Sequence, residues 1–271
     1  MFGARTACRT LVFKISIAVL LSLPLVLSAA AREDDVKELA PTGKLRVALV
    51  FAPEKSIFFV VKDRDGKPQG VTADIAGALG HAVNLPVEYV LFPNSGLATD
   101  AVEGGAVDVS FMPVDEERKQ RVAFGPNYVL GESTYMVTAA LPARTVEDVD
   151  RQGVRVVGIA NTTTIRAAAR TLKNTTISPI PSVSEAVAML RDGKADAFAL
   201  SRDSLPPYVK QVPGSRITDG AFQQIGIAVA VAKGNQAGLA AVTSFMNGAK
   251  SNGLVRIALN DAGYPDIAVA P

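Results

Sequence analysis

One short phrase occurs twice in this chain and sets its fold class. The first copy begins Gly-Ala-Val-Asp and spans 105–112, and the second begins Gly-Lys-Ala-Asp and spans 193–200. Each copy follows a stretch with helical periodicity, at 97–104 and 183–192, so the repeated unit is a helix, a glycine stop, an aspartate and an apolar strand. Such strands are typical of parallel sheets covered by helices on both faces. The repeat therefore predicts an α/β protein with two lobes and a cleft between them.

The carboxyl ends of the repeated strands are where we expect the function to lie. Ligands of open parallel sheets bind outside these ends, so the residues after Met112 and Leu200 are the candidate binding region. Asp108 and Asp196 stand at the opposite ends, where the strands begin. We therefore assign both aspartates a structural role.

Periodicity and turn residues order the other elements. In the first lobe we expect strands at 44–50, 87–92 and 109–112, helices at 71–83 and 97–104, a hairpin turn at 63–66 and a turn at 125–128. In the second lobe we expect strands at 154–160, 176–180 and 195–200 and helices at 163–172 and 183–192. Two strands, 133–138 and 224–232, would cross between the lobes, and helices at 237–250 and 255–262 would close the chain. The predicted boundaries are a leader at 32–43, a first lobe at 44–132 and 226–271, and a second lobe at 133–225.

The first 31 residues differ in composition from the rest of the chain. Three basic residues precede an apolar run at 15–27, which is followed by three alanines at 29–31. This order is typical of a cleavable secretory signal, and the run is shorter than the roughly 20 residues that a membrane span needs. We therefore expect residues 1–31 to be a signal peptide and the mature protein to lie in the periplasm.

Composition argues against several functions. The signal segment holds three of the 28 basic residues and none of the 26 acidic ones, so the mature chain is slightly acidic and has no basic cluster suited to nucleic acid. The only cysteine, Cys8, lies in that segment, which leaves no disulfide, thiolate metal site or cysteine nucleophile in the mature chain. The only histidine, His81, lies on a helix flank, and we interpret it as a solvated or partly packed residue. We expect no metal and no cofactor.

Several motifs follow one another along the mature chain. They are Leu45-Arg-Val, Asp65-Gly-Lys-Pro-Gln-Gly70 with Asp74, Gly105-x-x-Asp108, Glu117-Arg118-x-x-x-Val122-Ala-Phe124-x-Pro126-x-Tyr128, Gly158 with Thr163-Thr164, and Gly193-x-x-Asp196-Ala. Their order and spacing resemble family 3 of the bacterial extracellular solute-binding proteins, over roughly 44–264. The resemblance implies a two-lobe periplasmic binding protein of the Venus-flytrap type, with a mostly parallel sheet flanked by helices in each lobe and two hinge strands. It also implies a monomer that closes on a small molecule and docks on the permease subunits of an ABC importer.

The resemblance also implies a set of ligand contacts. By position, Phe51 is the aromatic residue that stacks on the ligand, and Arg118 is the arginine that grips its carboxylate. Thr163 and Thr164, at the start of a second-lobe helix, add to that grip. The position of the aspartate that takes an α-ammonium group is occupied by Ser201.

Two departures from the family pattern bear on the ligand. The stretch 111–115 lacks the Ser and Thr residues that usually precede the arginine, and Ser201 replaces the ammonium-binding aspartate, with Asp203 two residues later. A buried ammonium without a carboxylate partner costs several kcal/mol. The expected ligand is therefore a small organic carboxylate that is not clearly an α-amino acid. Asp203 at the rim and Tyr128 complete the candidate set. Phe51, Phe58 and Tyr128 could together form an apolar wall for the body of the ligand.

Each candidate also has a purely structural interpretation. The charged segment 115–121 could be a solvated face in which neighbouring carboxylates pair with Arg118, although the resemblance favours a ligand role. Asn161, Thr162 or Thr163 could simply cap a helix, and a cap residue can still face the cleft. A lone phenylalanine after a strand is usually part of the core.

Two other functions are compatible with the same scaffold. Some relatives of the family are periplasmic dehydratases acting on cyclohexadienyl acids, and such chemistry needs an acid or base. Here only Asp115, Glu117 or Asp203 could serve, so we expect no catalytic residues and no enzyme. The third possibility is an accessory or sensor protein for a periplasmic dehydrogenase.

Overall fold

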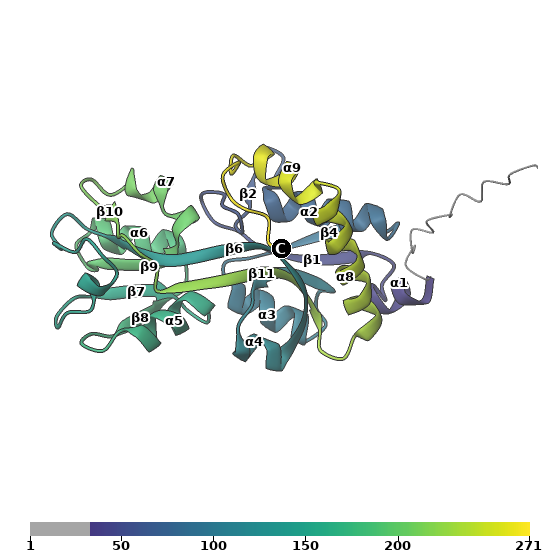
Figure 1. The fold of residues 1–271 in the computed structure, drawn as a ribbon, viewed down its shortest axis with the longest axis horizontal. Coiled ribbons are helices and arrows are strands. Elements are labelled where there is room, and N and C mark those ends of the chain that lie inside the picture. The colour runs from purple at the N-terminus through teal and green to yellow at the C-terminus, as the bar shows by residue number, and fades with distance from the viewer. Residues whose placement is uncertain (1–32) are drawn as a thin grey trace, which may run out of the picture. The chain divides into compact units, whose positions relative to one another are not determined.

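The first lobe is built on a sheet of parallel strands. The computed structural model describes residues 33–271, so the predicted signal peptide lies outside the described residues. Strand β1 (Leu45–Val50) lies between β4 (Val87–Phe92) and β5 (Val109–Pro113). Helix α2 (Val71–Ala82) covers one face of this sheet and α3 (Ser95–Glu103) the other (Figure 1). The predicted βαβαβ unit is confirmed.

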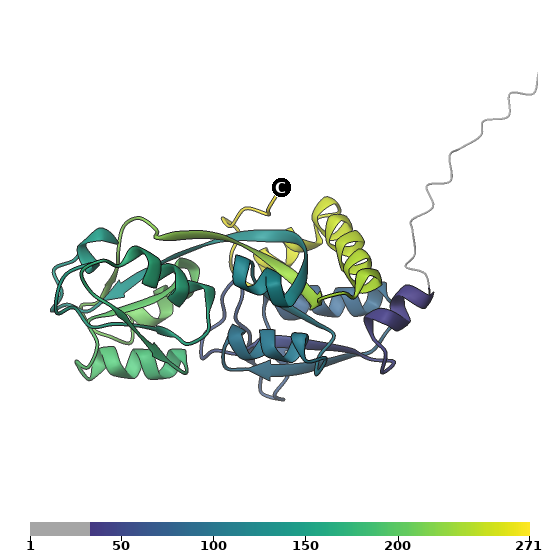
Figure 2. The same cartoon turned by 90° about the horizontal axis from the view of Figure 1, so that it is seen from below.

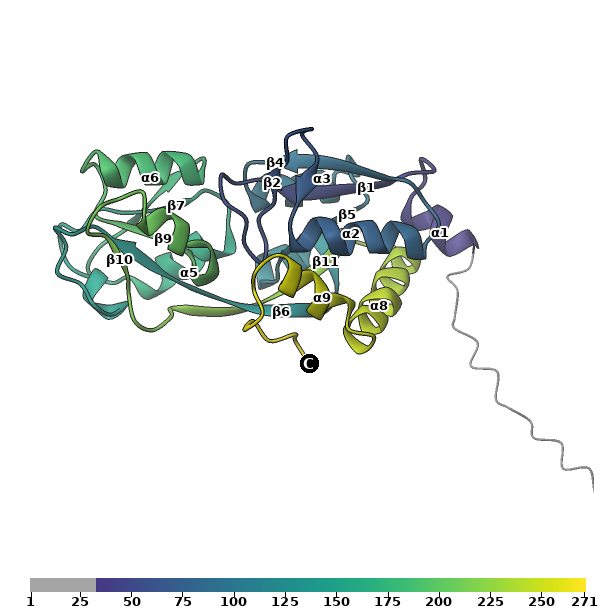
Figure 3. The same cartoon turned by 90° about the horizontal axis from the view of Figure 1, so that it is seen from above.

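The second lobe repeats this plan with fewer residues. Strand β7 (Val156–Ile159) lies between β9 (Ala197–Ser201) and β8 (Ile177–Ile180), and all three are parallel. Helices α5 (Thr163–Thr171) and α6 (Val183–Arg191) lie on either side of these strands (Figure 3). The repeated phrase therefore marks the corresponding helix-to-strand turn in each lobe.

Two long strands join the lobes. Strand β6 (Val122–Val137) pairs with β9 through its last residues, and β11 (Gln223–Ala232) pairs with β5. Because β6 and β11 also pair with each other, the ladder runs continuously in the order β4-β1-β5-β11-β6-β9-β7-β8. Figure 1 shows both strands running from one group of helices to the other. The lobe boundaries at 132/133 and 225/226 stay a prediction, since both strands belong to both lobes.

The prediction of a turn at 125–128 is wrong, because these residues lie inside β6. Two register irregularities in the β6–β11 ladder explain the error. Gly125 and Pro126 oppose one residue of β11, and Tyr128 is an extra residue between the next two pairs. Bulges of this kind accept a proline that a regular ladder would exclude.

The remaining elements pack around this frame. They are α1 (Glu33–Leu39), β2 (Val61–Lys62), β3 (Pro68–Gln69), α4 (Glu116–Arg121), two 3₁₀ turns (Glu147–Val149 and Arg202–Ser204), α7 (Pro206–Val209), β10 (Arg216–Ile217), α8 (Gln236–Ser251) and α9 (Leu254–Asp261). The main core packs on the first-lobe sheet and continues into the second lobe, where it includes Leu190 and Phe198. A separate core lies in the second lobe around Tyr135 and Val156. Figure 2 shows α8 beside the first-lobe sheet. After α9 the chain returns to β6, where Ala270 N donates to Tyr128 O at 2.9 Å. None of the described helices is long and apolar enough to cross a bilayer.

The aspartates of the repeated phrase have the structural role that the sequence predicts. Asp108 accepts hydrogen bonds from the backbone N–H of Arg46 (2.7 Å) and from its guanidinium (2.6 Å). Asp196 binds Arg155 in the same way, at 2.9 Å and 2.6 Å. Each pair ties the repeated phrase to the start of its lobe's central strand.

Replacing these aspartates should destabilise the protein unequally. Asp108 is buried and its partner is mostly buried, so Asp108→Asn is expected to lower the free energy of unfolding by about 3 kcal/mol. Asp196→Asn breaks a more exposed pair and is expected to cost about 1 kcal/mol or less. The hydrogen bonds to Arg155 lower the pKa of Asp196 from 3.8, so its contribution is complete above that value and is lost as the pH falls through the folded-state pKa. Urea denaturation of both variants between pH 3 and pH 7 measures this, and equal losses at neutral pH would contradict it.

Candidate functional site

A pocket lies between the two lobes and is lined by both. The space inside it is about 640 Å³ when the part open to solvent is included. The first lobe and the hinge strands contribute Phe58, Phe59, Pro93, Asn94, Ser95, Pro113, Gly131, Glu132, Ser133, Ile225 and Ile227. The second lobe contributes Ile159, Thr162, Thr163, Thr164, Val183, Ala199, Leu200 and Ser201. The lining therefore combines apolar side chains with hydroxyl and amide groups.

Three helices begin at this pocket. Asn94 caps α3 by accepting from Leu97 N at 2.9 Å, and Thr162 caps α5 by accepting from Ile165 N at 3.2 Å. Helix α6 begins at Val183, which also lines the pocket. Helix N-termini carry partial positive charge and unpaired N–H groups, so their convergence favours an anion.

The guanidinium of Arg118 lies directly behind the pocket wall. Its side chain comes from α4 and is 1% exposed. Nη2 donates to Ser95 Oγ at 2.6 Å, and Nη1 donates to Pro113 O at 2.9 Å. Both acceptors belong to residues that line the pocket, whereas Arg118 itself is not a lining residue. A guanidinium has five N–H donors, so these two bonds do not use all of them.

Among the described residues, no carboxylate forms an ion pair with the buried guanidinium of Arg118. Asp115 Oδ1 accepts from the backbone N–H of Arg118 at 2.9 Å, which caps α4 and leaves the guanidinium unpaired. Burial and, to a smaller extent, the nearby Arg166 lower the pKa of Arg118 to about 9, so the side chain is still protonated at pH 7. The expected alternative, in which neighbouring carboxylates neutralise Arg118, is not what the structure shows.

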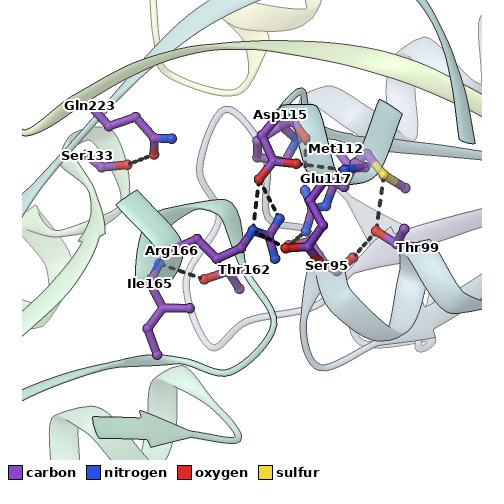
Figure 4. A network of polar contacts seen from close by, with 12 residues as sticks. Ser95, Thr99, Met112, Asp115, Glu117, Ser133, Thr162, Ile165, Arg166 and Gln223 are labelled. Carbon is purple, nitrogen blue, oxygen red and sulfur yellow. Dashed lines mark hydrogen bonds and ion pairs between the residues drawn. The ribbon is translucent and has the colours of Figure 1, made fainter. Parts of the chain in front are cut away.

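Three of the candidate residues line the pocket. Thr163 and Thr164 lie in the first turn of α5, and Ser201 lies at the end of β9. Thr164 Oγ1 is 3.3 Å from Ser133 Oγ, which also lies 3.1 Å from Gln223 Oε1. Figure 4 shows Ser133 and Gln223 side by side, joined by this hydrogen bond.

Phe51 and Tyr128 lie elsewhere. The ring of Phe51 is 37% exposed, outside the pocket, with Lys62 Nζ 5.5 Å from its centroid. Tyr128 is fully buried in the core, packed edge-on against Phe111 at 5.9 Å between centroids. The aromatic side chains that do line the pocket are Phe58 and Phe59, from the loop that follows β1.

Asp203 forms a separate contact between the two lobes. Its Oδ2 accepts from Ile57 N of the first lobe at 3.1 Å, and burial raises the pKa of its carboxyl group. Asp203 borders a second hollow, which is also lined by the C-terminal residues 266–271. It is therefore not a lining residue of the inter-lobe pocket.

Several lining residues could have been found from the sequence and were missed. Asn94 and Ser95 follow β4, so both obey the rule that points to the carboxyl ends of parallel strands. Pro113 directly follows Met112 and therefore lies in the binding region that the sequence predicted. Glu132 and Ser133 lie inside a hinge strand, where no local motif marks them.

The pocket has few charged groups of its own. Within residues 33–271, Glu132 is the one charged side chain that lines it, and Arg202 Nε holds Glu132 Oε2 at 3.2 Å. The same part of the chain contains no group of His, Cys, Asp and Glu arranged to hold a metal ion. The site can therefore offer hydroxyls, helix N-termini and one buried cation to a ligand.

Comparison with known proteins agrees with this geometry. The model of the bacterial extracellular solute-binding proteins, family 3, matches residues 50–259. The chain belongs to this family. Members are extracellular solute-binding proteins, which agrees with the two-lobe fold and the pocket between the lobes. A search of curated protein sequences finds no match to this family 3 protein.

Solved structures share its fold. The solute receptor for L-cysteine of Neisseria gonorrhoeae is 22% identical with a TM-score of 0.75, and the match covers 85% of this chain and 94% of that one. An amino acid ABC transporter substrate-binding protein from Streptococcus pneumoniae, bound to L-arginine, is 23% identical with a TM-score of 0.72, covering 86% and 99%. An ancestral amino acid-binding protein, described as a precursor of cyclohexadienyl dehydratase, is 26% identical with a TM-score of 0.73, covering 83% and 98%.

Proposed function

We propose that this family 3 protein is a periplasmic receptor that binds a small organic carboxylate between its lobes and delivers it to the permease of an ABC importer. It acts as a monomer after removal of residues 1–31, and it is not an enzyme. The transport role is supported by relatives such as the Streptococcus pneumoniae substrate-binding protein. Binding shifts the population toward the closed form, which the permease recognises.

The observation that carries this proposal is the unpaired guanidinium of Arg118. A buried cation is costly unless an anion compensates it, and the residues beside it on the pocket wall, Ser95 and Pro113, open onto the space where a solute can lie. A carboxylate there would receive charge-assisted hydrogen bonds. Thr163 and Thr164 approach from the opposite lobe at a helix N-terminus, which makes the carboxylate a bridge between the lobes.

The pocket is less suited to an α-ammonium group. The position that carries an aspartate in the family pattern is Ser201, whose Oγ lies 2.7 Å from Ser204 Oγ. Asp203 is turned toward Ile57, and Glu132 is held by Arg202. With these carboxylates occupied, an acid without an amino group avoids the cost of an unpaired buried ammonium.

Matched pairs of ligands test the solute class. The pairs are leucine and 4-methylpentanoate, phenylalanine and 3-phenylpropionate, and glutamate and glutarate, each differing by the ammonium group. A ligand that binds only the folded state raises the melting temperature, so a thermal-shift assay with an external dye measures binding, since the chain has no Trp. We expect the larger rise from the acid without the amino group in at least one pair. A rise from the amino acids alone would contradict the proposed class, and no rise in any pair would contradict carboxylate binding.

An enzyme on this scaffold is the second candidate, supported by the ancestral relative that preceded a dehydratase. Dehydration needs an acid or base at the substrate, and the lining carboxylate of the described pocket is Glu132. Incubation with a prephenate-like acid, followed by absorbance of an aromatic product, separates turnover from binding. Turnover that is lost in Glu132→Gln would establish the enzyme and contradict the receptor.

A further inference from the structure

A guanidinium from the second lobe reaches the first lobe beside the binding site. Arg166, on α5, places Nε 2.9 Å and Nη2 2.5 Å from Asp115 Oδ2. Its Nε also lies 3.0 Å from Glu117 Oε2. Figure 4 shows Arg166 extending toward Asp115 and Glu117. Asp115 caps α4 and Glu117 lies in its first turn, so this ion-paired group joins the two lobes. It borders a groove that is also lined by residues 223–225 of the hinge strand β11.

The contact is sheltered enough to influence the opening of the cleft. The Arg166 and Asp115 side chains are 20% and 12% exposed, and Glu117 is more open. Partly buried ion pairs are screened less than surface pairs, and a shared guanidinium holds both carboxylates with one ordered side chain. Opening of the lobes would break all of these contacts together.

The same contact explains why Arg118 remains unpaired. Asp115 uses Oδ1 for the backbone N–H of Arg118 and Oδ2 for Arg166, so neither oxygen turns to the Arg118 guanidinium. The group contains the guanidiniums of Arg118 and Arg166 and the carboxylates of Asp115 and Glu117. Without Arg166 it would carry a net negative charge next to the place where we expect a carboxylate solute.

We propose that Arg166 is a positioning residue that latches the two lobes together in the absence of solute, through Asp115 and Glu117. This inference rests on the proposed function in one respect, because it takes lobe closure to be the binding motion. A protein with the latch exists partly in the closed form before solute arrives, so solute binding has less conformational change to drive. The solute-free protein should then open when the latch is removed or screened.

Small-angle X-ray scattering of the solute-free protein tests the latch. Arg166→Gln removes the charge, Arg166→Lys keeps the charge without the planar fork, and Arg170→Gln is the matched control. Arg170 lies one turn later on α5 and borders the same groove, and no ion pair of Arg170 is formed within the described chain. Each protein is measured at about 0.01 M and about 1 M salt, between which the Debye length falls from about 30 Å to about 3 Å.

At low salt we expect a larger radius of gyration for Arg166→Gln than for the wild type, a value between the two for Arg166→Lys, and no change for Arg170→Gln. High salt should expand the wild type and the control only in part, because the contact between Arg166 and Asp115 is sheltered while Glu117 is exposed. It should not expand Arg166→Gln, which has no latch left to screen. Equal radii for Arg166→Gln and the wild type at low salt, or equal salt expansion of both, would overturn the latch. Because no solute is present, this result is independent of the thermal-shift assay, and each proposal can fail alone.

Discussion

Replacing Arg118 with methionine is expected to weaken carboxylate binding by at least about 100-fold. Two hydrogen bonds to a charged group are worth about 1.5–3 kcal/mol each, and about 3 kcal/mol corresponds to a loss of that size. Arg118→Lys retains the charge but not the planar guanidinium group, so its affinity for the carboxylate should fall about tenfold. Titration calorimetry with the acid that gives the largest thermal shift measures the loss.

The fold should survive this substitution, which separates a binding role from a structural one. Methionine removes a buried cation and its desolvation cost, and this gain offsets the two lost hydrogen bonds to Ser95 and Pro113. We therefore expect the free energy of unfolding to fall by no more than about 1 kcal/mol. Arg121→Met is the matched control, because Arg121 lies on the same helix and pairs with Asp100 and Glu103 on the surface. Wild-type affinity in Arg118→Met would remove this residue from the site.

The second large effect is expected from Gly96→Ala, which should prevent full closure. Gly96 lies in the first turn of α3, and a Cβ built there would lie 2.5 Å from Asn161 Cβ and 2.9 Å from Asn161 O, in the second lobe. Overpacking of this kind costs about 1–3 kcal/mol. Because only the closed form brings the two residues together, affinity should fall roughly 5- to 150-fold. The radius of gyration of the solute-free protein should also increase.

Two further variants make this result specific to the lobe contact. Gly248→Ala, in α8, adds a methyl group where nothing lies within 4 Å, so it should leave affinity unchanged. Asn161 has a φ of 58°, a conformation that glycine adopts freely, so Asn161→Gly should be tolerated and should partly restore binding to Gly96→Ala. Equal affinities for Gly96→Ala and Gly248→Ala would contradict closure at this contact.

Much of the fold follows from sequence patterns because each lobe repeats one local unit. The glycine, aspartate and apolar run of the repeated phrase determine a helix end, an ion pair and a buried strand, all within a few residues. The hinge strand β6 was only partly predicted, since Pro126 indicates a turn in any local analysis. Only the partner strand β11 shows that two bulges accommodate it.

The site was predicted less completely than the fold. Thr163, Thr164 and Ser201 follow strands or begin helices, and this position brings them to the pocket. Phe51 also follows a strand, yet the loop after it turns Phe58 and Phe59 inward instead. The pairing of Arg166 with Asp115 joins residues 51 positions apart on different lobes, and no spacing in the sequence reports such a contact.

A crystal structure of the protein with the acid that gives the largest thermal shift would show whether Arg118 holds the solute. We expect the acid between the lobes, with its carboxylate within hydrogen-bonding distance of the Arg118 guanidinium and its apolar part against Phe58 and Phe59. An acid bound on the outer surface, or one in the pocket with its carboxylate turned away from Arg118, would contradict this expectation.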